Sequence, residues 1–246
     1  MALPARPAVL VIGASAGGVA ALQAVLGALP GTLPVPVLAV LHLPRDRTSR
    51  IAEVLAPYCA LPVREAEDKQ PLQPGTVTFA PPDYHLLVED EGSVALSVDA
   101  PVLFSRPAID PLFDSAAAVF GGQVLALLLT GASSDGSEGV AAVRAAGGRA
   151  WLQCPEEAEA SMMPASALQH AGAEALEQVA AEEVKGLVAA VGDDLGGLLE
   201  EGPEGEGAGA LDEGGQAGRV GDVDFLVQDG DGVYLCLCLL AVGRVM

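Results

Sequence analysis

The sequence predicts an α/β protein whose doubly wound, mainly parallel sheet has helices on both faces and an inserted antiparallel β-hairpin. Three continuous apolar runs support this prediction, namely Val9 to Ile12, Val35 to Leu41 and Val124 to Leu129. Strands that are buried on both faces of a parallel sheet have such uninterrupted runs. Helical stretches follow the runs, and this alternation is typical of parallel sheets. Because 51% of the 246 residues are hydrophobic, the chain can bury a sizeable core.

The first part of the chain is predicted to alternate strands and helices. A helix from Val19 to Leu29 follows the first strand. After the second strand, Thr48 or Ser49 is a suitable N-cap for a helix from about Arg50 to Tyr58. We expect a short third strand at Leu61 to Glu65.

From Gly75 the pattern changes to short runs that are separated by turn residues. The runs are Thr76 to Ala80, His85 to Val88 and Ser93 to Val98. Short strands bounded by Pro, Asp and Gly favour hairpins, so we expect antiparallel hairpins to be inserted at this point.

The α/β alternation then resumes. A helix that is introduced by Pro107 is predicted to run to about Phe120. The strand that begins at Val124 leads into a helix through Ala145. The remaining predicted elements are a strand at Arg149 to Gln153 and helices at Met163 to His170 and Ala181 to Val191.

We expect three regions along the chain. Residues 1–191 form the α/β domain, and residues 192–222 form an acidic flexible linker, because this Gly- and Glu-rich stretch has few apolar residues to bury. Residues 223–246 are an apolar segment whose alternation around Asp229 to Gly232 resembles a β-hairpin.

The composition excludes several classes of partner. A formal net charge of -21 argues against nucleic acids and anionic membranes, because phosphate groups are bound by clustered Lys and Arg. Cys59, Cys154, Cys236 and Cys238 lack the spacing of a zinc site, so no metal and no cofactor are predicted. No apolar run reaches the length of a bilayer span. We therefore expect an acidic, soluble, cytoplasmic protein.

Three of the predicted strands end next to Ser15, His42 and Asp135. Ligands of doubly wound sheets gather outside such strand ends, and these side chains are the types of a hydrolytic triad. Serine needs a base such as imidazole to take its proton, and a carboxylate orients the imidazole. His85 and His170 are assigned structural roles, because one lies in the hairpin region and the other ends a helix.

The turn that holds Ser15 has more than one interpretation by itself. Gly13-Ala14-Ser15-Ala16-Gly17 fits the Gly-x-Ser-x-Gly nucleophile pattern, yet glycine-rich turns before a helix also bind phosphate or only pack. Asp135 is likewise suited to capping the helix that follows it. The positions of His42 and Asp135 at other strand ends favour the nucleophile.

Five short motifs occur in unbroken order between about residues 8 and 191. They are Gly13-Ala14-Ser15-Ala16-Gly17-Gly18, Leu41-His42-Leu43-Pro44, Ala80-Pro81-Pro82-Asp83-Tyr84-His85, Ser105-Arg106-Pro107-Ala108-Ile109-Asp110 and Leu129-Thr130-Gly131 through Asp135-Gly136. This series resembles the catalytic domain of chemotaxis-type protein-glutamate methylesterases. The resemblance implies a doubly wound domain that hydrolyses γ-glutamyl methyl esters on chemoreceptors to glutamate and methanol and deamidates certain glutamines.

The resemblance also implies roles for single residues. It assigns the nucleophile to Ser15, the base to His42 and the orienting carboxylate to Asp135. The backbone amides of Ala16 and Ala132 are the implied oxyanion donors, although the family commonly has threonine and methionine at these two positions. The family usually carries an N-terminal receiver domain. Because the first strand starts near residue 8, we do not expect control by phosphorylation within this chain, and the two alternatives are regulation by a partner in trans and regulation by the acidic tail.

The few cations near the predicted site are candidates for binding the substrate. Arg45 and Arg106, with Arg47 and Arg50, are expected to form a local positive rim on an otherwise acidic protein. Surface arginines without such a role are the alternative.

Three other functions fit parts of the pattern. Thr130 to Ser134 superficially matches a nucleotide loop, but Asp135 occupies the position of a required glycine. A serine hydrolase with the α/β-hydrolase fold also fits Gly-x-Ser-x-Gly. That fold places several strands before its serine, and Ser15 is too near the N-terminus for it. A methylesterase-like domain that binds receptors with little or no catalysis is the remaining alternative, because of Ala16 and Ala132.

Overall fold

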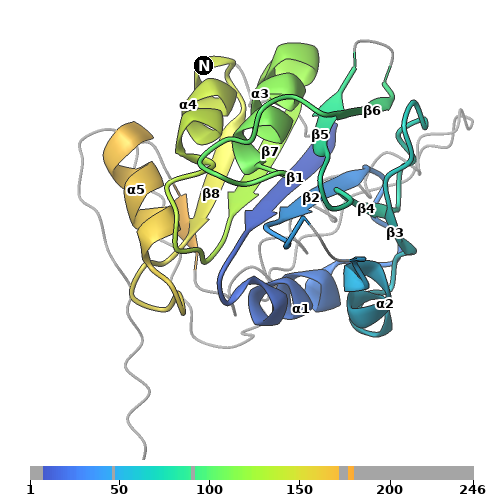
Figure 1. The fold of residues 1–246 in the computed structure, drawn as a ribbon, viewed down its shortest axis with the longest axis horizontal. Coiled ribbons are helices and arrows are strands. Elements are labelled where there is room, and N and C mark those ends of the chain that lie inside the picture. Colours follow the sequence, from blue (N-terminus) through green and yellow to red (C-terminus); the bar gives the residue numbers. More distant parts are fainter. Residues whose placement is uncertain (1–7, 46–47, 90–91, 172–176, 180–246) are drawn as a thin grey trace, which may run out of the picture. The chain divides into compact units, whose positions relative to one another are not determined.

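A computed structural model describes residues 8–45, 48–89, 92–171 and 177–179. Its main sheet has seven parallel strands in the order β3-β4-β2-β1-β7-β8-β9 (Figure 1). The strands are β1 (Val9–Ala14), β2 (Val37–Leu41), β3 (Val63–Glu65), β4 (Val77–Phe79), β7 (Val124–Leu128), β8 (Arg149–Gln153) and β9 (Glu177–Val179). The predicted class, a mainly parallel sheet with helices and a small antiparallel pair, is confirmed.

Strand β1 lies at the centre of the sheet, between β2 and β7. Successive side chains of a strand point to opposite faces, so Leu10 and Ile12 belong to one core and Val9 and Val11 to the other. All six residues of β1 are buried, which explains why this strand reads as a continuous apolar run.

Helices cover both faces of the sheet (Figure 1). One face packs against α1 (Gly18–Ala28) and α2 (Ile51–Leu55), through side chains such as Leu22 and Leu55. The other face packs against α3 (Ile109–Phe120), α4 (Ser137–Ala145) and α5 (Met162–Ala171), through side chains such as Leu112, Val140 and Met163.

The inserted hairpin consists of β5 (His85–Val88) and β6 (Val94–Ser97), which pair antiparallel as predicted. Leu86 of β5 joins the core beneath α3. This packing holds the hairpin, and the loop that leads from it to α3, against the main domain.

Three predicted elements differ from the structure. Strand β4 was expected in an antiparallel hairpin, but it is a buried parallel strand between β3 and β2. A three-residue apolar run between turns has the same pattern in either place. Helix α2 ends at Leu55, where Pro57 follows in a 3-10 turn over Ala56–Tyr58. Strand β9 was not predicted.

Several predictions lie outside the described residues. They are the helix at 181–191, the acidic linker at 192–222 and the C-terminal segment at 223–246. Among the helices that the structure describes, none is both long and apolar enough to cross a membrane.

Candidate active site

The loops after β1, β2 and β7 are held together by their backbones at one edge of the sheet. The Ser15 amide donates to the carbonyl oxygen of Thr130 at 2.9 Å, which joins the loop after β1 to the loop after β7. The His42 amide donates to the Ala14 carbonyl oxygen at 3.1 Å, which joins the end of β2 to β1. Ser15, His42 and Asp135 are therefore carried on adjacent strand ends, where parallel sheets of this kind bind their ligands.

Asp135 is the most constrained of these three residues. Its side chain is fully buried, and its Oδ2 lies 2.7 Å from Nε2 of His42 and 2.7 Å from the amide nitrogen of Ile109. Its Oδ1 accepts the amides of Asp110 and Gly136, each at 3.0 Å. Burial acts to raise the pKa of Asp135, but the hydrogen bonds from His42 and the two α3 amides outweigh it, so that the pKa lies below its ordinary value.

An ionised Asp135 determines which ring nitrogen of His42 is available to accept a proton. The carboxylate accepts a hydrogen from Nε2, so Nδ1 of the neutral ring carries a lone pair. The His42 side chain is 12% exposed, so a group of another molecule can still approach the ring. This arrangement suits a general base whose proton-accepting atom is Nδ1.

Ser15 lies in the turn between β1 and α1. Its carbonyl oxygen accepts the amide of Gly18 at 2.8 Å, and Gly17 has a positive φ of 75°, which favours glycine. A Cβ at Gly17 would lie 2.6 Å from Cβ of Glu159. The turn therefore needs glycine both for its conformation and for this close approach.

A second serine, Ser105, contacts the imidazole and was missed by the sequence analysis. Its Oγ lies 3.4 Å from Nδ1 of His42, near the limit of a hydrogen bond. Within the described residues, no hydrogen bond joins Ser15 to the ring. Such bonds are often long without substrate. The motif Ser105 to Asp110 could have indicated this contact, but only Arg106 of that motif was predicted to be a site residue.

The two backbone amides that were predicted as oxyanion donors lie at the surface. Ala16 and Ala132 are both exposed, and among the described residues neither amide donates a hydrogen bond. Thr130 fixes the nearby backbone, because its Oγ1 donates to the Ala16 carbonyl oxygen at 2.9 Å and accepts the Ala160 amide at 2.8 Å. Their assignment as oxyanion donors stays a prediction.

Asp110 is a second buried carboxyl group beside Asp135. It accepts the Gly139 amide at 2.8 Å on Oδ1. Burial, together with the negative charge of Asp135, raises the pKa of Asp110 to about 7. Two neighbouring carboxyl groups therefore have pKa values that are shifted in opposite directions, a pattern that is common at functional sites.

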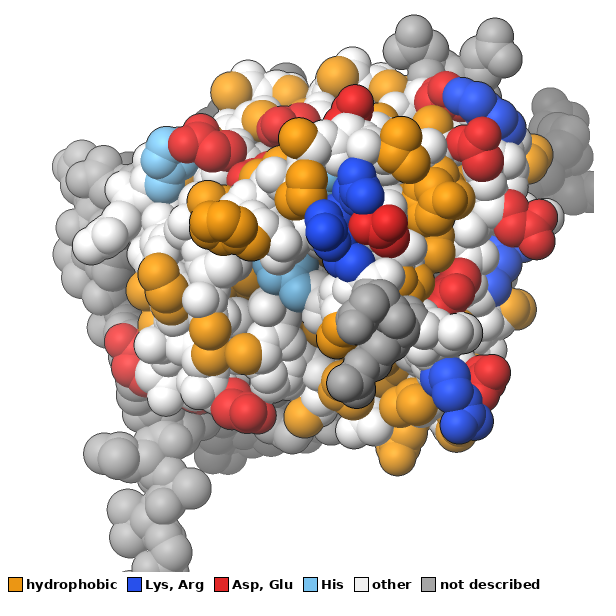
Figure 2. Space-filling model, viewed as in Figure 1, with side chains coloured by type: hydrophobic (Ala, Val, Ile, Leu, Met, Phe, Trp, Pro, Cys, Tyr) orange, Lys and Arg blue, Asp and Glu red, His pale blue; other side chains and the backbone are white. Residues whose placement is uncertain are grey.

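In the described part of the chain, the arginines near the site each lie beside an acidic side chain. Arg106 donates to Asp83 Oδ1 at 2.7 and 3.1 Å and to the carbonyl oxygens of Val98 and Asp99 at 2.7 and 2.9 Å. Arg45 lies 3.6 Å from Asp83, Arg50 pairs with Glu53 at 2.8 Å, and Arg47 lies outside the described residues. Figure 2 shows cationic side chains next to acidic ones on this face. Substrate binding by Arg45 and Arg106 stays a prediction.

The other two histidines pair with groups other than Ser15, His42 and Asp135. His85 is buried, with Nε2 3.1 Å from the Ala100 carbonyl oxygen, and its Nδ1 accepts the Ala108 amide at 3.2 Å. His170 lies 3.1 Å from Glu138 at the end of α5. In the part of the chain that the structure describes, no group of three or more His, Cys, Asp and Glu side chains could hold a metal ion.

Comparison with known proteins gives consistent matches. The family model described as CheB methylesterase matches residues 10–188. A Leptospira interrogans protein is 38% identical over 160 residues, which are 65% of this chain and 83% of that protein. Myxococcus xanthus has a relative named protein-glutamate methylesterase/protein-glutamine glutaminase 4, which is 42% identical over 65% of this chain and 45% of its own length. The crystal structure of the Thermotoga maritima CheB methylesterase catalytic domain superposes with a TM-score of 0.69 at 30% identity and covers 76% of this chain and 100% of that one.

Proposed function

Because this chain belongs to the CheB methylesterase family, we propose that it hydrolyses γ-glutamyl methyl esters on chemoreceptor-type proteins through Ser15, His42 and Asp135. The single observation that best supports this proposal is the 2.7 Å contact between His42 Nε2 and the buried Asp135 carboxylate, beside the Ser15 turn. A carboxylate that orients an imidazole next to a serine is the arrangement that acyl transfer requires.

The proposed reaction has two steps. In the first, Ser15 Oγ attacks the ester carbonyl carbon, and its proton passes to Nδ1 of His42. The tetrahedral intermediate collapses, His42 returns the proton to the leaving oxygen, and methanol departs. In the second step, His42 takes a proton from water and the hydroxide attacks the carbonyl carbon of the acyl-enzyme. The second tetrahedral intermediate collapses, His42 returns the proton to Ser15 Oγ, and the glutamate carboxyl group and free Ser15 are formed. Asp135 holds the imidazole throughout and stabilises its protonated form.

Two features favour Ser15 over Ser105 as the nucleophile. Ser15 precedes the 11-residue helix α1, whose N-terminal amides and dipole stabilise developing negative charge. The amides of the exposed residues Ala16 and Ala132, which donate no hydrogen bond within the described residues, could serve an oxyanion. By contrast, the backbone N–H and C=O of Ser105 pair with Val102 in a tight turn. We assign Ser105 to the support of His42.

The same chemistry extends to glutamine side chains. An amide differs from the methyl ester in its leaving group, so protonation by His42 would release ammonia where the ester releases methanol. Deamidation of receptor glutamines is therefore part of the proposal. The Myxococcus xanthus relative carries both activities in its name.

The proposal is tested by Ser15→Ala, assayed for methanol release from a methylated receptor protein. We expect kcat to fall by at least about 10³-fold, because the nucleophile is removed. Ser93→Ala is the matched control. Ser93 lies between β5 and β6, at the end of the hairpin opposite Val98 and Asp99, whose carbonyl oxygens bind Arg106 near the site. Full turnover by Ser15→Ala would exclude the mechanism, and an inactive wild-type protein would exclude the function.

A further inference from the structure

We infer that the turn Val102–Ser105, called the ridge turn below, docks the protein substrate beside the active site. Leu103 and Phe104 at its tip would contact an apolar side chain of the substrate, while Arg45 would contact an acidic side chain of the same segment. This inference rests on the proposed function, because it assumes a protein substrate.

The backbone of the ridge turn is unusual for the residues it carries. Val102 and Ser105 exchange two backbone hydrogen bonds, of 3.1 and 2.8 Å. Between them, Leu103 and Phe104 have φ values of 45° and 68°. Two successive residues with positive φ normally include Gly, Asn or Asp, because large side chains crowd the backbone there. Conformations of this kind concentrate at functional sites.

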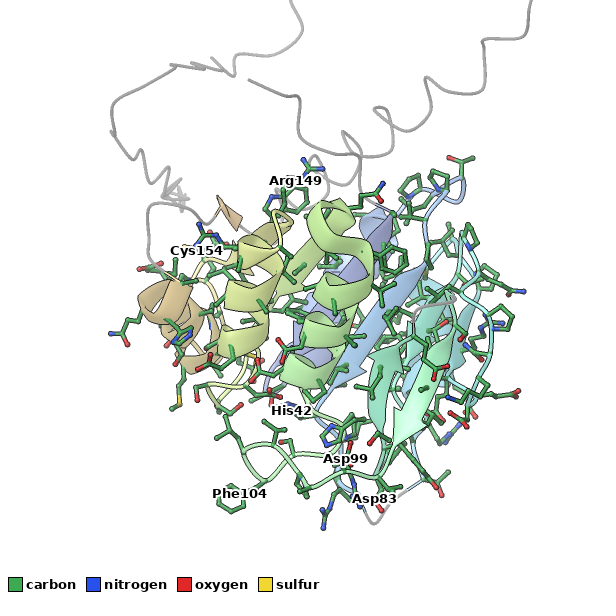
Figure 3. The ribbon with its side chains drawn as sticks, turned by 90° about the horizontal axis from the view of Figure 1, so that it is seen from above. His42, Asp83, Asp99, Phe104, Arg149 and Cys154 are labelled. Atoms are coloured by element: carbon green, nitrogen blue, oxygen red, sulfur yellow. The ribbon has the colours of Figure 1, made fainter. Side chains whose placement is uncertain are left out.

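This conformation turns two large apolar side chains toward solvent. Phe104 is 97% exposed and Leu103 is 49% exposed. Figure 3 shows Phe104 projecting away from the body of the domain, on the same side of the molecule as His42. Single exposed apolar residues are ordinary. An aromatic side chain that projects from the tip of a tight turn is different, because aromatic residues, Phe included, are enriched at protein interfaces.

The ridge turn is fixed to the active site at its base. Ser105 Oγ lies 3.4 Å from His42 Nδ1. The next residue, Arg106, is held by Asp83 and by the carbonyl oxygens of Val98 and Asp99. A tip that is held in place loses little conformational freedom when a partner binds, which favours affinity.

The surroundings of the ridge turn indicate the chemistry of its partner. A hollow of about 560 Å³ is lined by Arg45, Pro101, Leu103 and Phe104. Among the lining residues that the structure describes, Arg45 carries the charge, and its side chain is 47% exposed. Asp83 lies 3.6 Å from Arg45 but is already bound more closely by Arg106 at 2.7 Å. A segment with an apolar and an acidic side chain is therefore complementary to this hollow.

A second hollow shows how the docked segment would relate to the site. It measures about 570 Å³ and lies against Leu103 and Val102, with Asp110, Ser134, Glu138 and His170 also in its lining. Leu103 thus borders both hollows. Asp110, in the lining of the second hollow, contacts Asp135. A substrate segment that crosses the ridge turn would therefore extend from the hollow beside Arg45 to the edge of the proposed active site.

The test compares a methylated receptor protein with a small ester, N-acetylglutamate γ-methyl ester. We expect Phe104→Ala to lower kcat/KM on the protein about 10-fold more than on the small ester, chiefly through KM, as loss of an interface anchor does. Tyr58→Ala is the matched control, because Tyr58 is an aromatic residue that is 53% exposed in the 3-10 turn after α2. It should leave the ratio of the two kcat/KM values unchanged.

The charge is tested separately with Arg45→Glu, and the control is Arg149→Glu, which changes an arginine at the start of β8, on the side of the domain opposite His42 (Figure 3). We expect only Arg45→Glu to lower the ratio. Equal losses on both substrates, or no loss on the protein, would overturn the inference.

If the wild-type protein hydrolyses neither substrate, the proposed function fails instead. Binding of Ser15→Ala and of Ser15→Ala/Phe104→Ala to the methylated receptor, measured by calorimetry, then tests docking alone, and equal affinities would overturn it.

Discussion

The Oδ2 atom of Asp135 lies 2.7 Å from Nε2 of His42 and accepts the backbone amide of Ile109 at the same distance. One carboxylate oxygen therefore joins the end of β2 to the start of α3. The other oxygen of Asp135 accepts two further amides. Both oxygens are thus used as acceptors, which determines how the site should respond to substitution.

The first prediction concerns Asp135→Asn. An asparagine has only one acceptor oxygen, so its NH₂ group must face donors whichever way it is turned. We expect kcat for ester hydrolysis to fall by about 10³- to 10⁴-fold, because the imidazole loses its orienting acceptor. The free energy of unfolding should fall by about 1–3 kcal/mol for the donors left unsatisfied.

Steady-state methanol release and denaturant unfolding measure the two effects of Asp135→Asn. Asp114→Asn is the control, because Asp114 is an exposed acid on α3. An Asp135→Asn protein with near-normal kcat would show that His42 does not depend on this carboxylate.

The second prediction distinguishes the two serines near His42. The 3.4 Å contact between Ser105 and Nδ1 is a weak hydrogen bond, so Ser105→Ala should reduce kcat/KM by less than about 10-fold. A serine-directed fluorophosphonate should label Ser15 in the wild-type protein and in Ser105→Ala, as read by peptide mass spectrometry. Labelling of Ser105, or complete inactivation by Ser105→Ala, would reverse the roles assigned to the two residues.

The strand ends that carry Ser15, His42 and Asp135 were predictable because β1, β2 and β7 are buried on both faces. Such strands have continuous apolar sequences, so the polar residue at each end is recognisable. The antiparallel pair β5–β6 was predictable from its turn residues and short runs. The three-residue strand β4 was misplaced, because a short apolar run between turns does not distinguish a parallel strand from a strand of an antiparallel hairpin.

The contacts of Ser105 and Asp110 could not be derived from local patterns. Ser105 approaches His42 only because the ridge turn folds back on itself and Arg106 is bound by Asp83. Asp110 is buried because α3 begins against the loop that holds Asp135. Both contacts join segments that are separated by more than 20 residues, so no spacing rule reports them.

The third prediction concerns the pH dependence of stability that arises from Asp110. In the folded protein its pKa is about 7, whereas an unfolded Asp has its ordinary value near 3.8. Between about pH 4 and pH 7 the folded state therefore holds a proton that the unfolded state has released. The unfolded state binds fewer protons, so this group makes stability fall as pH rises through that window and contributes no further change above it.

Asp110→Asn removes this titration while keeping an acceptor for the Gly139 amide. Relative to the wild type, the variant should gain stability progressively from about pH 4 to pH 7 and then hold that gain. Denaturant unfolding at several pH values measures the difference, and Glu157→Gln, which changes an exposed acid, is the control. A stability difference that does not vary with pH would contradict the prediction.

The fourth prediction compares two glycines that have positive φ but different surroundings. Gly136 has a φ of 92°, and a Cβ there would lie 2.6 Å from Leu128 Cδ1 and 3.1 Å from Cγ2 of Ile109, whose amide binds Asp135. Gly92 has a φ of 72°, and apart from its chain neighbours no atom of the described residues lies within 4 Å of such a Cβ. Gly92→Ala should cost about 1–2 kcal/mol of stability, the price of a left-handed alanine.

Gly136→Ala should cost about 1–3 kcal/mol more than Gly92→Ala, because it also overpacks the core around Leu128. Guanidinium unfolding of both variants at one pH measures the difference. We further expect only Gly136→Ala to lower kcat, since displacement of Ile109 would shift the amide that positions Asp135. Equal destabilisation of the two variants would mean that the core around Leu128 accommodates the added methyl group, and an unchanged kcat of Gly136→Ala would exclude the coupling of this glycine to the site.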